Sequence, residues 1–311
     1  MILTPQVEVA LYPDLGEPLT IPLDKIHGGE EFKIDVIDLR LPAGRLEKTL
    51  EAERIILECS VKKGEKTLEQ VKKEVNLLAY NDYSLKELYL ELLTCFVTPN
   101  HPVIMQVLKQ VREVLKRNTG NNSLHGYQGS SQDVYEMTKA LYETFKDFGI
   151  SYINPPASFE GNQKIRFPDR VLIDQMGTCL DLSVLACACL EQMGLDPLII
   201  VVSGHAFIGV WLEEEQHNYN PVIDEPFKLT NLIQAESLLL FDSSSYAFHP
   251  QLPFEAAIRE AISYLNNKPL IGAVDIRICR KKGYKPLPIR MDAIATPEID
   301  RQEITKSNRF P

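Results

Sequence analysis

The first part of the chain alternates between apolar and polar positions at a period of two, which is the pattern of half-buried strands. In the clearest run, Phe32, Ile34 and Val36 are apolar and charged residues stand between them. Strands are predicted over Val7–Pro13, Leu19–Leu23, Phe32–Leu41 and Arg54–Lys63. Turn residues separate these runs, and short strands at this spacing favour a small β-sandwich in residues 1–80.

The apolar spacing then changes to that of helices. Apolar residues recur every three or four positions in Ser84–Val97 and again in Pro99–Leu115, where Pro102 suits a first helical turn. A longer helix is predicted over Ser130–Gly149, with Ser131 as its N-cap. The buried stripe of this helix is expected to consist of Val134, Met137, Leu141, Phe145 and Phe148.

One further helical segment, GTCLDLSVLACACLEQMG, contains three cysteines. We expect the helix to begin at Cys179 and to end at Gly194, because glycine is the residue that most often terminates a helix at its C′ position. At ~100° per residue, Cys187 and Cys189 point about 80° and about 280° away from Cys179. That spacing excludes a zinc site or a disulfide among the three. The helix is apolar nearly all round, so Cys187 and Cys189 are predicted to be small core residues.

Cys179 differs from the other two because it stands where the helix begins, directly after Thr178. The free amide groups and the dipole at a helix N-terminus stabilise an anion, so they favour the thiolate form of a cysteine there. The same amide groups can bind an oxyanion. Cys179 is therefore a candidate nucleophile, and a buried structural cysteine is the alternative.

A nucleophilic cysteine needs a base, and His205 is the candidate. The sequence after Gly194 predicts two neighbouring strands, and His205 begins the second, Gly204–Glu213. Its place at a strand start beside small residues leaves it accessible to a partner. A histidine packed into the core is the alternative.

A carboxylate that orients the imidazole would complete such a site. Asp242 ends the predicted buried strand within Glu236–Ser245 and is the preferred candidate. The alternative is that Asp242 only caps the following turn. In that case Asp224 or Asp275 would be the carboxylate that orients His205.

Composition narrows the class of protein. The chain has 311 residues, six cysteines and a formal net charge of −10. The N-terminus lacks the features of a secretory signal and no apolar run is long enough to span a membrane, so we expect a reduced, cytoplasmic protein without a membrane contact. The net negative charge argues against direct binding of nucleic acid, because binding to a phosphate backbone requires a basic surface. Cys279–Lys285 is one candidate for a local basic patch, and a solvated hairpin is the preferred interpretation of it.

A cysteine at a helix start, a histidine on a strand and an aspartate at a strand end, in that order, resemble the transglutaminase-like branch of the papain-like cysteine enzymes. The resemblance implies an α+β fold, in which an N-terminal β-sandwich precedes a transglutaminase-like domain with a central helix on an antiparallel sheet. It implies a catalytic triad of Cys179, His205 and Asp242. By analogy with a papain glutamine, Gln163 would assist an oxyanion or support the loop, with Thr178 beside it.

A narrower resemblance is carried by the stretch from NPPASFEGNQKIRFPDR to GHAFIGVWL, and by LAYNDYSLKELYLELLTCFVTPNHP and PFEAAIREAISYL on either side. These segments are similar to the N-terminal region of very large bacterial helicase–nuclease proteins, over roughly Asn76 to Pro288. Those relatives often carry glutamate where this chain has Asp242. The implied domains are a β-sandwich (1–80), a helical connector (81–120), a transglutaminase-like domain (121–290) and a polar tail or linker (291–311).

The expected function is that of a cysteine-dependent amide hydrolase or acyl transferase, such as a peptidase, a deamidase or a transglutaminase-like enzyme, with no cofactor and no metal. The expected partners are a protein or peptide substrate and a helicase or nuclease, as a separate chain or a continuation of this one. The alternative is a non-catalytic interaction module of a helicase–nuclease defence-type system. A metal-dependent enzyme has little support, because the remaining histidines lack ligand spacing: His101, His125, His217 and His249.

Overall fold

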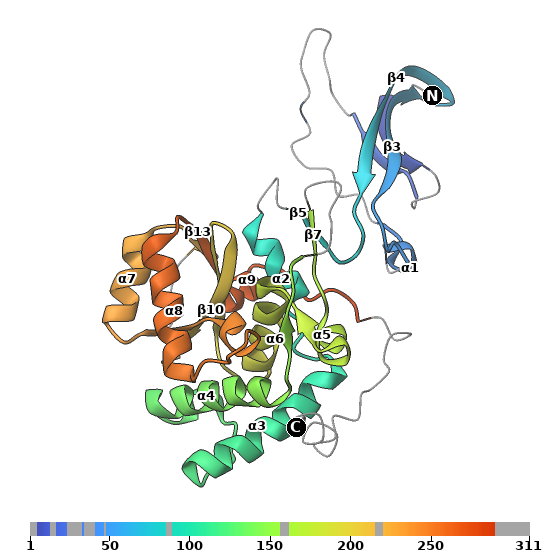
Figure 1. Cartoon of the computed structure of the whole chain (residues 1–311). Coiled ribbons are helices and arrows are strands. Elements are labelled where there is room, and N and C mark those ends of the chain that lie inside the picture. Colours follow the sequence, from blue (N-terminus) through green and yellow to red (C-terminus); the bar gives the residue numbers. More distant parts are fainter. Residues whose placement is uncertain are drawn as a thin grey trace. The chain divides into compact units, whose positions relative to one another are not determined.

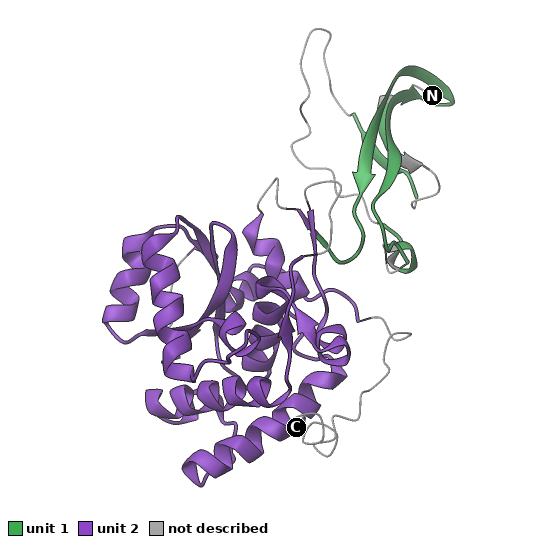
Figure 2. Cartoon of the chain, viewed as in Figure 1, with its two compact units in different colours: residues 1–82 green, residues 83–311 purple. Residues whose placement is uncertain are grey.

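The structure, a computed structural model, is mixed α+β with mainly antiparallel sheets (Figure 1). It describes residues 5–12, 17–23, 33, 41–46, 48–84, 89–155, 162–214 and 220–289. The chain forms two compact units, residues 1–82 and residues 83–311 (Figure 2). The division lies close to the predicted boundary at residue 80, and the predicted tail, 291–311, lies outside the described residues.

The described strands of the first unit form one four-stranded antiparallel sheet in the order β2-β1-β3-β4. Its elements are β1 (Pro5–Tyr12), β2 (Leu19–Pro22), α1 (Ala43–Leu46), β3 (Glu53–Lys63) and β4 (Lys66–Leu77). Three of the four predicted strands are therefore confirmed. The fourth, Phe32–Leu41, lies outside the described residues except for its positions 33 and 41, and the second layer of a sandwich stays a prediction.

Strand β4 was missed because its side chains are almost all exposed, so no apolar face marks it. Pairing with β3 stabilises it instead, from Lys63 opposite Lys66 to Glu53 opposite Leu77. The turn between the two strands places Gly64 at a φ of 60°, a left-handed conformation that glycine adopts without strain. The turn residue Gly64, directly after the predicted strand Arg54–Lys63, was the available sign of a hairpin.

The second unit is built around a five-stranded antiparallel sheet in the order β11-β13-β9-β10-β12. Its strands are β9 (Pro197–Val202), β10 (His205–Trp211), β11 (Val222–Ile223), β12 (Leu238–Phe241) and β13 (Leu270–Asp275). Helices α7 (Pro226–Gln234) and α8 (Phe254–Asn267) supply Leu229, Ala261 and Leu265 to the core on one face. Figure 1 shows the sheet between α8 and α6 (Cys179–Gln192), which packs on β9 and β10.

Helix α6 is enclosed on all sides. Helices α3 (Pro102–Thr119), α4 (Ser131–Asp147) and α5 (Pro168–Asp174) pack against it in addition to the sheet. From Leu182 to Leu190 every residue of α6 is fully buried, and this confirms the predicted buried helix. Cys187 and Cys189 are core residues as predicted, and all six cysteines are unpaired.

Several short elements complete the second unit. They are β5 (Asp82–Ser84), η1 (Leu90–Leu92), α2 (Leu93–Phe96), η2 (Gly126–Gln128), β6 (Ser151–Tyr152), β7 (Asn162–Lys164), β8 (Met176–Gly177), η3 (Ser243–Tyr246) and α9 (Ile276–Lys281). β5 pairs with β7, and β6 pairs in parallel with β8.

Three local predictions need correction. The N-cap of α4 is Ser130, not Ser131, because the side chains of Ser130 and Asp133 form a capping box with each other's backbone amides. The basic stretch forms the end of α9 and the residues after it, not a hairpin, because Asp275 caps a helix there. Residues 81–120 are not a separate connector, since α3 packs on α4 and α6 within the second unit.

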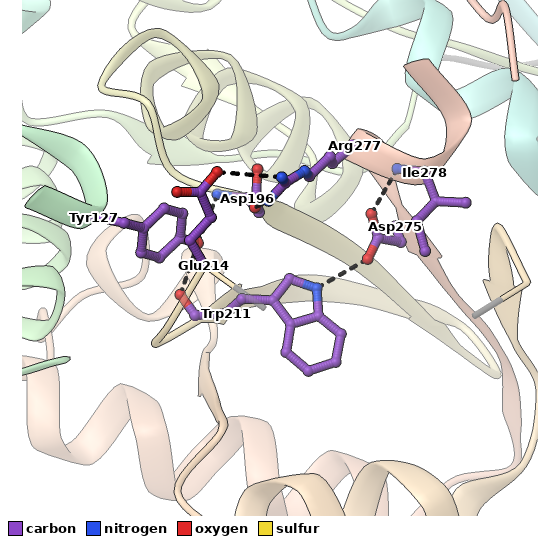
Figure 3. A network of polar contacts seen from close by, with 7 residues as sticks. All are labelled: Tyr127, Asp196, Trp211, Glu214, Asp275, Arg277 and Ile278. Carbon is purple, nitrogen blue, oxygen red and sulfur yellow. Dashed lines mark hydrogen bonds and ion pairs between the residues drawn. The ribbon is translucent and has the colours of Figure 1, made fainter. Parts of the chain in front are cut away.

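A polar network ties the end of β10 farthest from His205 to its neighbours (Figure 3). The Trp211 indole N–H donates to Asp275 Oδ2 at 2.9 Å, and Asp275 Oδ1 accepts from the Ile278 amide at the start of α9 at 2.9 Å. The Tyr127 hydroxyl donates to the Trp211 carbonyl and accepts from the Asp196 amide, both at 2.9 Å. These bonds fix the position of β10 in the sheet.

Arg277 extends this network toward the surface (Figure 3). Its guanidinium pairs with Asp196 and, at 3.2 Å, with Glu214 Oε1. The charge on Arg277 therefore compensates a carboxylate that the fold has partly removed from water.

We predict that Asp275→Ala lowers the free energy of unfolding by about 2–3 kcal/mol, because it removes a helix cap and leaves a buried indole N–H without its acceptor. Asp275→Asn keeps one oxygen and should cost about half as much. Denaturant unfolding measures both values. The exposed Asp224→Ala is the matched control and should stay within about 0.5 kcal/mol of wild type. An equally small effect of Asp275→Ala would contradict the structural role of Asp275.

Candidate active site

The N-terminus of α6 is held by a buried capping box. Thr178 is the N-cap, and its hydroxyl accepts from the Asp181 amide at 3.2 Å while Asp181 Oδ2 accepts from the Thr178 amide at 2.9 Å. The Asp181 carboxylate is fully buried and its charge is balanced by Arg166, whose Nη1 lies 3.0 Å from Oδ2. Cys179 is the first residue of the helix and is half-buried, so the cap fixes the sulfur at the edge of the core.

His205 and Asp242 meet on the neighbouring strands β10 and β12. The antiparallel register places Ile208 opposite Phe241, so the aspartate that follows β12 lies on the same face as the histidine that begins β10. His205 Nε2 is 2.9 Å from Asp242 Oδ1, and their side chains are only 8% and 3% exposed. A bond this well shielded from water orients the imidazole ring.

The Asp242 carboxylate is held by the turn that follows it. The Ser244 amide donates to Oδ1 at 3.2 Å, and the hydroxyls of Ser244 and Ser245 donate to Oδ2 at 2.7 and 2.8 Å. Asp242 is thus both the cap of η3 and the partner of His205, so the two alternative roles coincide. Asp275 bonds to Trp211 and Asp224 is exposed, so neither replaces it.

Cys179 completes the constellation, because its side chain lies close enough to the His205 imidazole to raise the pKa of the ring. With Nε2 engaged by Asp242, Nδ1 is the ring nitrogen that remains for the sulfur. Ser183, one turn along α6, contacts Ser243 at 3.2 Å between the two hydroxyl oxygens and so joins the cysteine helix to the aspartate turn. The structure therefore brings all three sequence-predicted residues together.

The electrostatics of the pair favour a charged imidazole. Burial lowers the pKa of His205, but the hydrogen bonds and charges of Asp242 and Cys179 outweigh it and raise the pKa to about 9. Burial acts to raise the pKa of Asp242, yet the bond to His205 and those to the serines hold it below its usual value. An imidazolium between a carboxylate and a sulfur is the state expected near neutral pH.

The two predicted support residues lie next to the nucleophile. Gln163, on β7, donates from Nε2 to the Thr178 hydroxyl oxygen at 3.2 Å. Thr178 is fully buried and its hydroxyl oxygen also accepts from Asp181. Gln163 therefore supports the helix cap, and its amide is aimed at Thr178.

One residue at the site was not found from the sequence. The Tyr152 phenol lies close enough to Cys179 for the thiol to help raise the pKa of the phenol, although the two residues are far apart on the chain. The cause is the parallel pairing of β6 with β8, which sets Tyr152 opposite Gly177. Both strands have only two residues, so no periodicity indicated this pairing.

No family model matches the chain, and no curated protein matches it. Among the described residues, no group of three or more His, Cys, Asp or Glu side chains is arranged to hold a metal ion. In the same part of the chain, no helix has the length and apolar character needed to cross a membrane.

We predict that stability falls at alkaline pH through His205. Because the pKa in the folded state, about 9, lies above the ordinary value of 6.5, the stabilisation is complete below pH 6.5 and is lost as pH rises through 9. The free energy of unfolding should drop by about 2 kcal/mol more between pH 6 and pH 9.5 in wild type than in His205→Gln. The exposed His249→Gln serves as control and should follow wild type. Parallel curves for wild type and His205→Gln would contradict the assignment.

We predict that iodoacetamide modifies Cys179 before the other cysteines of the second unit. Cys187 and Cys189 are fully buried, and burial raises the pKa of both thiols, so they should react only after unfolding. Burial also raises the pKa of the half-buried Cys95 thiol. Peptide mass spectrometry at pH 7 gives the order of modification, and earlier labelling of Cys95 would refute the prediction.

Proposed function

We propose that the chain is a cysteine-dependent amide hydrolase or acyl transferase of the transglutaminase-like kind. One observation carries the proposal: a single imidazole hydrogen-bonds the buried Asp242 carboxylate and lies beside the Cys179 side chain at a helix N-terminus. Such an arrangement supplies a nucleophile, a proton carrier and a group that orients the carrier. The sequence resemblance to this branch of the papain-like enzymes points to the same chemistry.

The reaction begins with attack of the Cys179 sulfur on an amide carbonyl. The S–C bond forms and the carbonyl π pair moves to oxygen, where the Cys179 amide at the start of α6 can stabilise it. The His205 imidazolium then gives its proton to the leaving nitrogen, the C–N bond breaks and the amine departs. Asp242 keeps the ring oriented throughout.

Release of the acyl group returns the enzyme to its first state. Neutral His205 takes a proton from water or from an amine, the oxygen or nitrogen bonds to the acyl carbon, and the C–S bond breaks. Water is the simpler acceptor and is preferred here, which makes the reaction a hydrolysis. Cys179 is only half-buried, which is compatible with the approach of a substrate.

The substrate class follows from the resemblance and stays a proposal. A protein or peptide amide is the expected substrate, and a helicase or nuclease the expected partner. In that setting the activity would process or modify a protein associated with a helicase–nuclease system. A non-catalytic interaction module would keep the fold but give no covalent acyl-enzyme.

The test uses p-nitrophenyl acetate, which acylates an activated cysteine and releases one equivalent of coloured p-nitrophenolate. Wild type should give a burst of one equivalent, and Cys179→Ala should give none. His205→Gln should acylate at least about 100-fold more slowly, and so should Asp242→Asn. Cys59→Ala, a cysteine of the first unit, is the matched control and should acylate as wild type does. Equal bursts from wild type and Cys179→Ala would leave only the non-catalytic module.

A further inference from the structure

Tyr152 is anchored beside the nucleophile by backbone bonds on both sides. The Ile153 amide donates to the Gly177 carbonyl at 3.0 Å, and the Tyr152 amide donates to the Ala247 carbonyl at 3.0 Å. β6 is thus fixed between the segment that leads into α6 and the segment that follows η3. The backbone of Tyr152 has one defined position next to Cys179.

The side chain of Tyr152 is directed at the start of α6. Its phenol lies beside the Cys179 side chain and the Cys179 backbone, and both influence the pKa of the phenol. The ring stacks on Phe248, with centroids 4.4 Å apart and planes at 24°. The hydroxyl therefore lies where the sulfur and the first free amide of the helix converge, which is the region that a carbonyl oxygen enters when the sulfur attacks.

The phenol stays protonated at this place. Burial, the charge of Cys179 and the hydrogen bond to its side chain raise the pKa of Tyr152 to about 12. A protonated phenol can donate a hydrogen bond to an anion throughout the neutral and mildly alkaline range. Tyr152 is therefore a permanent donor beside the sulfur.

The donor expected from the sequence is directed elsewhere. The Gln163 amide donates to the Thr178 hydroxyl oxygen, one residue before the nucleophile. The Thr178 hydroxyl oxygen accepts from Asp181 inside a fully buried cap. Between Gln163 and Tyr152, the tyrosine is the one whose side chain lies beside Cys179 itself.

We propose that Tyr152 is a catalytic residue: its phenol donates a hydrogen bond to the oxyanion that forms when Cys179 attacks a carbonyl, together with the Cys179 amide. This role rests on the proposed function and names the side-chain donor of its oxyanion site. In the resting enzyme the same hydroxyl lies beside the sulfur, and it donates to the new oxyanion as the S–C bond forms. No proton is transferred from the phenol.

The test compares two reagents that differ in the charge they develop. p-Nitrophenyl acetate is attacked at its carbonyl: the S–C bond forms, the π pair moves to oxygen, and the return of that pair expels p-nitrophenolate. Iodoacetamide is attacked at its CH₂ carbon, with iodide leaving and no oxyanion forming. A donor to the oxyanion should affect the first reaction and not the second.

The variant is Tyr152→Phe, which keeps the ring that stacks on Phe248 and removes only the hydroxyl. We expect acylation by p-nitrophenyl acetate to slow by about 100-fold, the scale for loss of one oxyanion donor, while alkylation by iodoacetamide changes less than about threefold. The exposed Tyr89→Phe is the matched control and should match wild type with both reagents. Thermal unfolding of each variant confirms that the fold is kept.

Three results would overturn the proposal. Unchanged acylation in Tyr152→Phe would show that the hydroxyl is not an oxyanion donor. Equal slowing of both reagents would make Tyr152 a group that only stabilises the thiolate, and faster reaction with both would make it a cover over the sulfur. In each of these three cases wild type still gives a burst of p-nitrophenolate. If wild type itself gives no burst, the proposed function is wrong, and this outcome is distinct from the other three.

Discussion

The constraint on which the second unit depends is the burial of a helix that is apolar around its whole circumference. Helix α6 has no face that tolerates water, so the sheet must cover one side and α3, α4 and α5 the others. Burial in this way leaves only the two ends of the helix partly exposed. Its first residue, Cys179, consequently lies at the margin of the core and is half-buried.

The same enclosure creates an electrostatic requirement at that margin. A buried helix start has free amide groups, and the capping box of Thr178 and Asp181 satisfies part of this need. The buried charge of Asp181 is then balanced by Arg166, just as the carboxylate of Asp242 is balanced by His205. Asp181 and Asp242 thus each have their own cation, so the imidazole is held for the sulfur and is not drawn toward a second acid.

Strand β10 connects the candidate active site to the stability of the fold. His205 begins the strand, and Trp211 at its other end is bonded through Asp275 to α9. A shift of one residue in register would turn His205 to the opposite face, away from Asp242. The structural network at one end thus keeps the histidine correctly placed at the other, without any contact between them.

Local sequence patterns are enough to place each chemistry-bearing residue within its own element: Cys179 at a helix start, His205 at a strand start and Asp242 just after a strand. Helix capping and the periodicity of apolar residues depend only on neighbouring residues, so they can be recognised in the sequence. The same patterns predict the N-cap of α4 one residue too late. They also miss strand β4, because its side chains are almost all exposed and show no apolar periodicity. Three contacts follow from the packing of the folded chain and not from local patterns. Asp242, and not Asp275, bonds His205; Gln163 supports the helix cap; and Tyr152 lies beside Cys179. Those contacts depend on strand register and on the pairing of two-residue strands, which are set by the packing of segments distant in the sequence.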